Sequence, residues 1–297
     1  MIQLFIDWDD FYSKIRANSW PDCTGFDQIK NLPEWIQHEI YCIHLPNAVQ
    51  IDSSPRNIKI LASTAEEIDN LCQHSEENFF VENNVSNEPF KILNKHGIDI
   101  YYAKSQMGGG EQRLEYFNQA LQELFPTRIF NNCLEWCAGP GPIGFSLLGN
   151  NTCHNLVLAE IYKPSIESCK KTIANLDKKY LDKVKVHHLK DISSLPNSYK
   201  FDLIVGNPPF RGGKLITKDA SFARRGADPG FKIHKRFFDS VKNYLTPDGI
   251  IILDEGSQFS GPADFKSMIE DNGLIISKVF EFTDNGFDYF MVIEHAK

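Results

Sequence analysis

The sequence predicts an α/β fold whose sheet is mostly parallel and ends in an antiparallel hairpin. Short apolar runs typical of buried strands alternate with helical segments; the runs cover residues 133–137, 155–160, 184–189, 201–205 and 249–254. Two further strands, 275–282 and 288–294, flank Asn285-Gly286, a pair typical of hairpin turns. A doubly wound parallel sheet would instead end in β-α-β, so this hairpin argues against a dehydrogenase.

Composition limits the classes of protein that the chain can represent. Its 297 residues, 42% of them hydrophobic, suffice for one large or two modest domains. The net charge is −8, and residues 1–100 carry 7 Lys+Arg against 16 Asp+Glu, which opposes a nucleic-acid binder. The seven cysteines form no C-x-x-C pair, and Cys133 and Cys137 are expected on one strand as packing residues. With no basic leader and no apolar run of membrane-spanning length, we expect a reduced cytoplasmic protein without a metal site.

Two domains are predicted, residues 1–106 and 107–297. The first reads as a mixed α/β region with short strands at 48–51, 57–62, 78–81 and 98–103, and helices at 27–40 and 64–74. It contains no catalytic constellation, and its interpretation as a substrate-recognition domain rests on position alone. The loop Met107-Gly108-Gly109-Gly110 is either a flexible linker or a ligand loop, followed by a helix over 114–125.

The segment Asn207-Pro208-Pro209-Phe210 ends the strand 201–205. Neither proline can donate to a ladder, so the chain leaves the sheet in a stiff turn. The amide of Asn207 and the carbonyl of Pro208 can then point together into the cleft where open α/β sheets bind ligands. Two adjacent acceptors suit a planar –NH2 group, and Phe210 offers an aromatic face.

A glycine turn follows the strand 133–137, in the order Ala138-Gly139-Pro140-Gly141-Pro142. Glycines at 139 and 141 let the backbone pass close to a ligand. The prolines remove two N–H groups that a pyrophosphate would need. A second strand ends in Glu160, about twenty residues beyond the turn, the position from which an acidic residue accepts from ribose hydroxyls.

Together the glycine turn and Asn207-Pro208-Pro209-Phe210 resemble motifs I and IV of class I S-adenosylmethionine-dependent N-methyltransferases, the release-factor glutamine type in particular. The resemblance covers about 107–297 and implies a Rossmann-like sheet of seven strands with its last strand inserted. It also implies that Glu135 reaches the cofactor's amino group, directly or through water, and that Ile161 or Tyr162 lies against the adenine. Asp191 would bond the adenine amino group, with a surface turn as the alternative. The implied cofactor contacts are Glu135, Cys137, Ala138, Gly139, Gly141, Glu160, Ile161, Asp191, Ile192 and Asn207.

The resemblance implies methyl transfer from S-adenosylmethionine to a planar amide or amine nitrogen of a small molecule or protein side chain. Asn207, Pro208, Pro209 and Phe210 are the predicted catalytic residues, and no histidine is assigned a role. Residues 211–236 hold eight Lys+Arg against two Asp; within them Arg211 and Lys214 are predicted, with Phe210, to contact the substrate. The alternatives are a nucleic-acid adenine methyltransferase and a non-catalytic cofactor-binding protein.

Overall fold

The structure is a computed structural model that describes residues 49–51, 58–60, 89–103, 110–210, 228–257, 260–281 and 288–296. The chain divides into two compact units. One comprises Met1–Glu82, Phe210–Phe231 and Gln258–Ser260, and the other Asn83–Pro209, Lys232–Ser257 and Gly261–Lys297. None of the described helices combines the length and the apolar character needed to cross a bilayer.

In the first unit, two of the predicted strands are confirmed. β1 (Val49–Ile51) and β2 (Ile58–Ile60) pair antiparallel, with Gln50 opposite Lys59. The helices predicted at 27–40 and 64–74, and the strand predicted at 78–81, lie outside the described residues.

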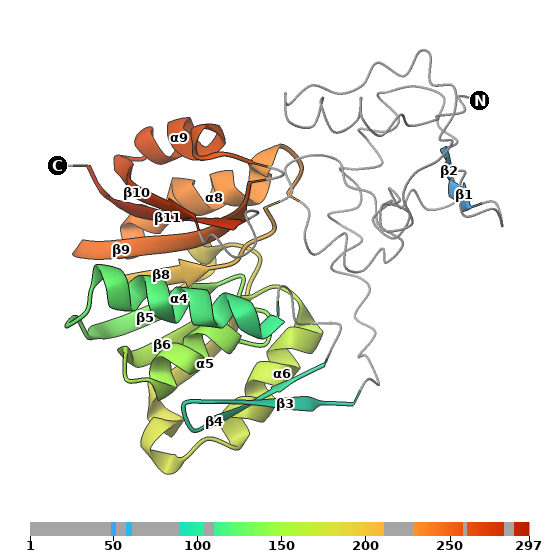
Figure 1. The fold of residues 1–297 in the computed structure, drawn as a ribbon, viewed down its shortest axis with the longest axis vertical. Helices are drawn as coiled ribbons and strands as arrows, with labels where there is room; N and C mark the ends of the chain where they lie inside the picture. Colours follow the sequence, from blue (N-terminus) through green and yellow to red (C-terminus); the bar gives the residue numbers. More distant parts are fainter. Residues whose placement is uncertain are drawn as a thin grey trace. The chain divides into compact units, whose positions relative to one another are not determined.

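The second unit alternates strands and helices along most of its length (Figure 1). Its elements are β3 (Lys91–Lys95), β4 (Ile98–Tyr102), α4 (Gly110–Leu124), β5 (Phe130–Trp136), α5 (Pro142–Gly149), β6 (Cys153–Glu160), α6 (Lys163–Ala174), η2 (Lys178–Lys183), β7 (Val184–His188), η3 (Ile192–Ser194), β8 (Phe201–Gly206), α8 (Lys232–Val241), η5 (Lys242–Tyr244), β9 (Leu245–Gly256), α9 (Pro262–Glu270), β10 (Leu274–Glu281) and β11 (Asp288–His295).

Seven strands form one sheet in the order β10-β11-β9-β8-β5-β6-β7. The pairs between β9 and β7 along this order are parallel, whereas β11 is antiparallel to both β9 and β10. The last strand is therefore inserted between two earlier ones, which confirms the predicted class I methyltransferase-like sheet. The turn expected at Asn285-Gly286 lies outside the described residues.

The two faces of the sheet are covered by different helices. On one face Leu203, Val205 and Ile252 join a buried cluster with side chains of α4, α5 and α6. Phe117 of α4 packs edge-on against Phe290 of β11, with ring centroids 4.8 Å apart. On the other face Trp136 stacks on Phe237 of α8 at 3.8 Å. Strand residues alternate between these two apolar layers, as side chains of a doubly covered sheet must.

The hairpin β3–β4 packs on this second unit. Ile98 and Ile100 are buried in the cluster that includes α5, and the Tyr101 N–H donates to Thr172 Oγ1 of α6 at 2.9 Å. The compact unit begins at Asn83, and the domain boundary predicted between 106 and 107 stays a prediction. Substrate recognition by the residues before the hairpin stays a prediction.

The start of β9 differs from the prediction. The strand predicted to begin at residue 249 begins at Leu245. Phe201 pairs with Leu245 and Leu203 with Ile250, so the additional β9 residues are accommodated as an irregularity in the ladder. The first residues of β9 are of types common in turns, so the sequence gives no local sign that they belong to a strand.

Inserting β11 requires a filled core behind it, which can be tested by substitution. We expect Phe290→Ala to lower the free energy of unfolding by about 3–5 kcal/mol, because Phe290 is fully buried against Phe117. Val279→Ala, at a partly exposed position on β10, should cost about 0.5 kcal/mol or less. Urea denaturation measures both, and equal losses would contradict a core role for β11.

Candidate active site

Five neighbouring strands bring polar side chains to one edge of the sheet. Register pairs Trp136 of β5 with Gly206 of β8, Gly206 with Leu253 of β9, and Gly256 of β9 with Asp288 of β11. The carboxyl ends of the parallel strands and the start of β11 therefore meet, at the edge where open α/β sheets bind ligands. The polar residues gathered there are Glu160, Glu135, Asn207, Asp254 and Asp288.

The glycine turn between β5 and α5 has left-handed backbone angles at Cys137 (φ 54°), Gly139 (φ 54°) and Gly141 (φ 80°). Cys137 was expected on the strand, but β5 ends at Trp136, and Cys137 is a half-buried turn residue. A Cβ on Gly141 would lie 2.8 Å from Phe145 Cε2, so the helix packs too closely for a side chain there. Ala138 is buried and its N–H donates to the Ala159 carbonyl of β6 at 3.1 Å, which joins the turn to the next strand.

The Glu135 carboxylate lies under this turn. Its Oε2 accepts from the Gly144 N–H at 2.7 Å and its Oε1 from the Ile143 N–H at 3.3 Å, both in the first turn of α5. The side chain is 1% exposed, so it is directed at the helix rather than placed for direct contact with a cofactor's amino group. Burial raises the pKa of Glu135 to about 8, although the two N–H groups act in the opposite direction.

This contact also decides which anions α5 can bind. A helix N-terminus binds phosphate through its free N–H groups. Here Pro142 has none, and those of Ile143 and Gly144 already bond Glu135. A dinucleotide's pyrophosphate would therefore find the first turn occupied. A Cβ at residue 144 would lie 2.7 Å from Glu135 Oε2, so glycine is needed there for the carboxylate to approach.

Glu160, at the end of β6, joins two loops. Its Oε1 accepts from Ile161 N–H at 2.8 Å and Tyr162 N–H at 2.7 Å, and its Oε2 from Gly139 N–H at 2.5 Å. Burial raises its pKa, and these three N–H groups oppose that shift. A carboxylate has about four lone-pair sites, so Oε2 retains capacity for one further donor. Ile161 is half-buried and its carbonyl lies 2.9 Å from His188 Nε2.

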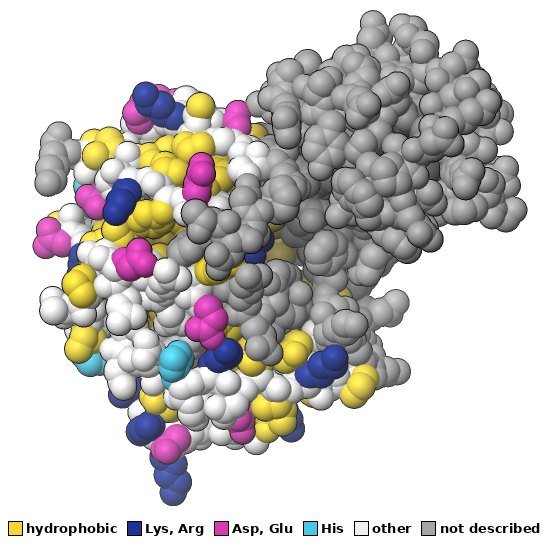
Figure 2. Space-filling view, in the orientation of Figure 1, with side chains coloured by type: hydrophobic (Ala, Val, Ile, Leu, Met, Phe, Trp, Pro, Cys, Tyr) yellow, Lys and Arg dark blue, Asp and Glu magenta, His cyan; other side chains and the backbone are white. Residues whose placement is uncertain are grey.

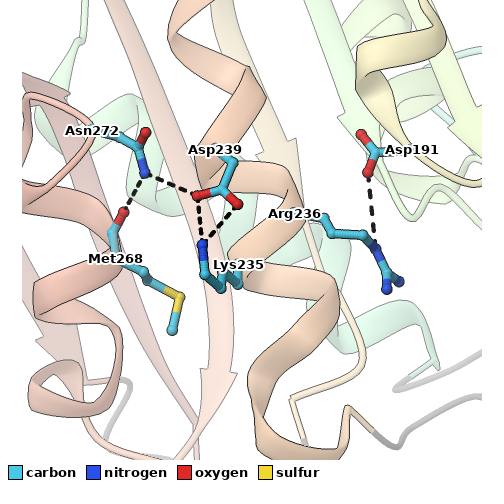
Figure 3. A network of polar contacts seen from close by, with 6 residues as sticks. All are labelled: Asp191, Lys235, Arg236, Asp239, Met268 and Asn272. Carbon is cyan, nitrogen blue, oxygen red and sulfur yellow. Dashed lines mark hydrogen bonds and ion pairs between the residues drawn. The ribbon is translucent and has the colours of Figure 1, made fainter. Parts of the chain in front are cut away.

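Asp191 begins the short helix η3. Its Oδ1 accepts from the Ser193 N–H at 2.9 Å, the geometry of an N-cap. Arg236 reaches toward it from α8, with Nε 3.8 Å from Oδ2, while the neighbouring Lys235 bonds Asp239 (Figure 3). Ile192 is 1% exposed, so its side chain is a core residue.

The segment after β8 leaves one polar side chain available. Asn207 is half-buried, and within the described part of the chain its amide makes no hydrogen bond. Pro208 is buried and Pro209 half-buried. A Cβ at Gly206 would lie 3.0 Å from the Trp136 carbonyl oxygen, so the turn starts where β8 and β5 come close. Phe210 is half-buried and groups with the first unit, and Arg211, Lys214 and the loop 104–109 lie outside the described residues.

Sequence reasoning missed a charged group at the end of β9. Arg113 of α4 bonds Asp254 Oδ2 through Nη1 and Asp288 Oδ1 through Nη2, the latter at 2.8 Å. Burial raises the pKa of Asp254 to about 8; Asp288 and Glu255 act in the same direction and Arg113 opposes them. Among the residues that the structure describes, the buried Asp254 Oδ1 has no hydrogen-bond partner, a state that costs about 1–3 kcal/mol. The only local sign of this group in the sequence was the pair of consecutive acids, Asp254 and Glu255, at the end of an apolar strand.

The other missed pair lies across the sheet. His234 of α8 and Glu255 are both fully buried, and His234 Nε2 lies 2.9 Å from Glu255 Oε1. The imidazole packs against Trp136 and Phe265, with ring centroids at 5.5 and 4.8 Å. The sequence analysis assigns no histidine a role, so it gives no sign of this pair.

Comparison with known proteins agrees with this fold. A family model described as "Methyltransferase small domain" matches residues 110–269. The sequence matches no curated protein closely enough to be counted as a relative.

Several solved structures of methyltransferases resemble the chain. The glycopeptide N-methyltransferase MtfA aligns over 65% of this chain and 91% of its own, with 12% identity and a TM-score of 0.48. A ribosomal-protein methylase from Lactobacillus delbrueckii subsp. bulgaricus aligns over 64% and 82%, with 13% identity and a TM-score of 0.45. A tRNA methyltransferase from B. subtilis aligns over 60% of this chain and only 64% of its own, just under two thirds, with 12% identity and a TM-score of 0.44.

The buried Glu135 predicts a pH dependence of stability. The folded protein holds the proton up to about pH 8, whereas the unfolded chain releases it near the ordinary value of 4.5. The stabilisation by this group is therefore complete below about pH 4.5 and is lost as pH rises to about 8. Relative to Glu135→Gln, the wild type should lose on the order of 1 kcal/mol of unfolding free energy per pH unit in that window. Urea denaturation at several pH values measures this difference, and a pH-independent difference would refute it.

Proposed function

The chain belongs to the methyltransferase small domain family, and we therefore propose that it methylates a planar amide or amine nitrogen held at Asn207. The family assignment confirms the predicted class of enzyme, a methyltransferase, and the predicted cofactor, S-adenosylmethionine. The nature of the acceptor is our proposal. Small molecules and protein side-chain amides, as in the release-factor type that the motif resembles, are the proposed acceptors.

The residues at the edge of the sheet fit a cofactor without phosphate groups. The first turn of α5 has no donors left for a pyrophosphate, because Glu135 occupies them. We assign the ribose to Glu160 Oε2, which retains a lone pair beside the glycine turn. Glu135 then acts indirectly, by fixing the turn over which the cofactor lies, and Asp191 fixes η3 at the end of β7.

The observation that carries the proposal is the Asn207 amide. It follows β8, at the middle of the polar edge, and has no hydrogen bond within the described residues. When bound, the cofactor supplies an activated methyl group on a sulfonium. The carbonyl oxygen of the Asn207 side chain and the Pro208 carbonyl would accept hydrogen bonds from both N–H groups of the –NH2 that is to be methylated. This orients the nitrogen lone pair toward the methyl carbon, and the gain comes from positioning and from hydrogen bonds that strengthen in the transition state.

A nucleic-acid acceptor is the second candidate, because residues 211–236 carry an excess of basic residues. The charge of the rest of the chain opposes it. On the face of the second unit seen in Figure 2, basic and acidic side chains are interspersed and form no basic stripe. Phosphate contacts would make binding steeply salt-dependent, so a salt titration separates the two candidates.

A cytoplasmic location also stays a prediction.

The Glu160 assignment predicts a selective loss of cofactor affinity. We expect Glu160→Gln to weaken binding of S-adenosylhomocysteine roughly tenfold or more, because a charged hydrogen-bond acceptor is lost. Asp202→Asn is the matched control. Asp202 also accepts two backbone N–H groups, from Asn131 and Asn132 at 2.7 and 2.8 Å, but at the opposite edge of the sheet. Calorimetry should find that Asp202→Asn binds S-adenosylhomocysteine with unchanged affinity. Equal losses of affinity in both variants would remove Glu160 from the site.

The Asn207 assignment is tested by methyl transfer itself. Labelled S-adenosylmethionine is added to a cell extract that is then separated into small-molecule, protein and nucleic-acid fractions. We expect label in the small-molecule or protein fraction, reduced on the order of 100-fold by Asn207→Ala, the effect of losing a group that acts in the transition state. Asn155→Ala, on the exposed amino end of β6, should retain full transfer. Normal turnover by Asn207→Ala would exclude the proposed mechanism.

A further inference from the structure

We propose that Asp254 is a further catalytic residue, whose carboxylate oxygen Oδ1 faces the acceptor nitrogen and stabilises the positive charge that forms there. The inference rests on the proposed nitrogen methylation and adds a residue with no counterpart in the motif around Asn207. It also narrows the acceptor to a group that becomes cationic during transfer.

Position supports this role first. β9 is the parallel neighbour of β8, with Gly206 opposite Leu253, so Asn207 and Asp254 follow the last paired residues at one level. Val205 and Ile252 lie in the same buried cluster on the α4–α5 face of the sheet. Because strand side chains alternate, Asp254 continues on that face, the face of Glu135 and of the glycine turn.

The hydrogen bonding of Asp254 supports it next. Arg113 Nη1 donates to Oδ2 and thereby fixes the orientation of the carboxylate, while Arg113 Nη2 donates to Asp288 Oδ1. Oδ1 is buried and has no hydrogen-bond partner within the described part of the chain, a state that native proteins rarely leave uncompensated. Two carboxylates share one guanidinium, so these three side chains carry one net negative charge when both acids are ionised. A group beside Oδ1 that gains positive charge would be stabilised by this carboxylate.

The chemistry of methyl transfer provides such a group. The nitrogen lone pair forms the new N–C bond as the S–C bond breaks, and that electron pair stays on sulfur, which becomes a neutral thioether. The positive charge thus moves from sulfur to nitrogen. One of the two N–H bonds held by Asn207 and Pro208 then breaks, its electrons neutralise the nitrogen, and the proton passes to water. A fixed carboxylate in a buried site stabilises the charge as it forms.

The surrounding charges set the pH range in which Asp254 can act. Its pKa lies at about 8 because of burial, with Asp288 and the adjacent Glu255 adding to the shift and Arg113 opposing it. Glu255 faces the opposite helix layer, where it bonds His234. The ionised form of Asp254 therefore increases as pH approaches 8, and a bound cation favours that form further.

The test compares two cofactor analogues and needs no acceptor. Sinefungin carries an amino group in place of the sulfonium methyl, whereas S-adenosylhomocysteine has a neutral thioether. By calorimetry, we expect the wild-type preference for sinefungin to rise about tenfold between about pH 6.5 and 8.5. Asp254→Asn keeps the side-chain size and an acceptor for Arg113. It should abolish that rise and leave the affinity for S-adenosylhomocysteine within about twofold.

Asp288→Asn is the matched control, because it removes the other carboxylate on the same Arg113. It should keep the preference and move its rise to lower pH, since a like charge that raises the Asp254 pKa is lost. The Asp288→Asn variant also tests the role of Asp254 if Asp254→Asn fails to fold. An unchanged sinefungin preference in Asp254→Asn, or no pH dependence in the wild type and Asp288→Asn, would overturn the role of Asp254 and leave the proposed function intact. Failure of the wild type to bind either analogue would instead overturn the proposed function, and this inference with it.

Discussion

The site depends on the contact between the buried Glu135 carboxylate and the N-terminus of α5. Two N–H groups of the helix donate hydrogen bonds to this side chain, so the direction of α5 and the shape of the preceding turn are fixed together. The same contact requires glycine at 144 and occupies the donors that phosphate would use, while burial of the side chain raises the pKa of Glu135 to about 8. A single acid thus selects the kind of nucleoside ligand that this edge of the sheet can accept.

The end of β9 joins the two helix layers. Its consecutive acids point to opposite faces, so Asp254 meets Arg113 of α4 and Glu255 meets His234 of α8. One short strand end thereby sets the positions of both helices beside the turn that carries Asn207. The two sides differ in character. The α4 side holds carboxylates around one guanidinium, whereas the α8 side encloses its pair among Trp136, Phe237 and Phe265.

Much of the fold could be predicted because its signals are local. Apolar runs, the glycine turn and the terminal hairpin each lie within a few residues of sequence, and the strand order agrees with them. The start of β9 and the left-handed Cys137 could not be predicted, because tertiary contacts override the local preference there. The partners of Arg113 lie 141 and 175 positions away, a separation at which one sequence carries no pairing signal. Glu135 was placed at the right strand end, but its helix partner depends on packing.

The insertion of β11 between β9 and β10 has a consequence for biosynthesis. β9 leaves the ribosome roughly thirty residues before β11, an interval of roughly 2–6 s at ordinary elongation rates. During that interval its apolar stretch Ile250–Leu253 presents an open backbone edge that another chain could pair with. Because the missing neighbour comes later in the sequence, the nascent chain cannot close its own sheet. The native sheet is therefore complete only once β11 has been synthesised.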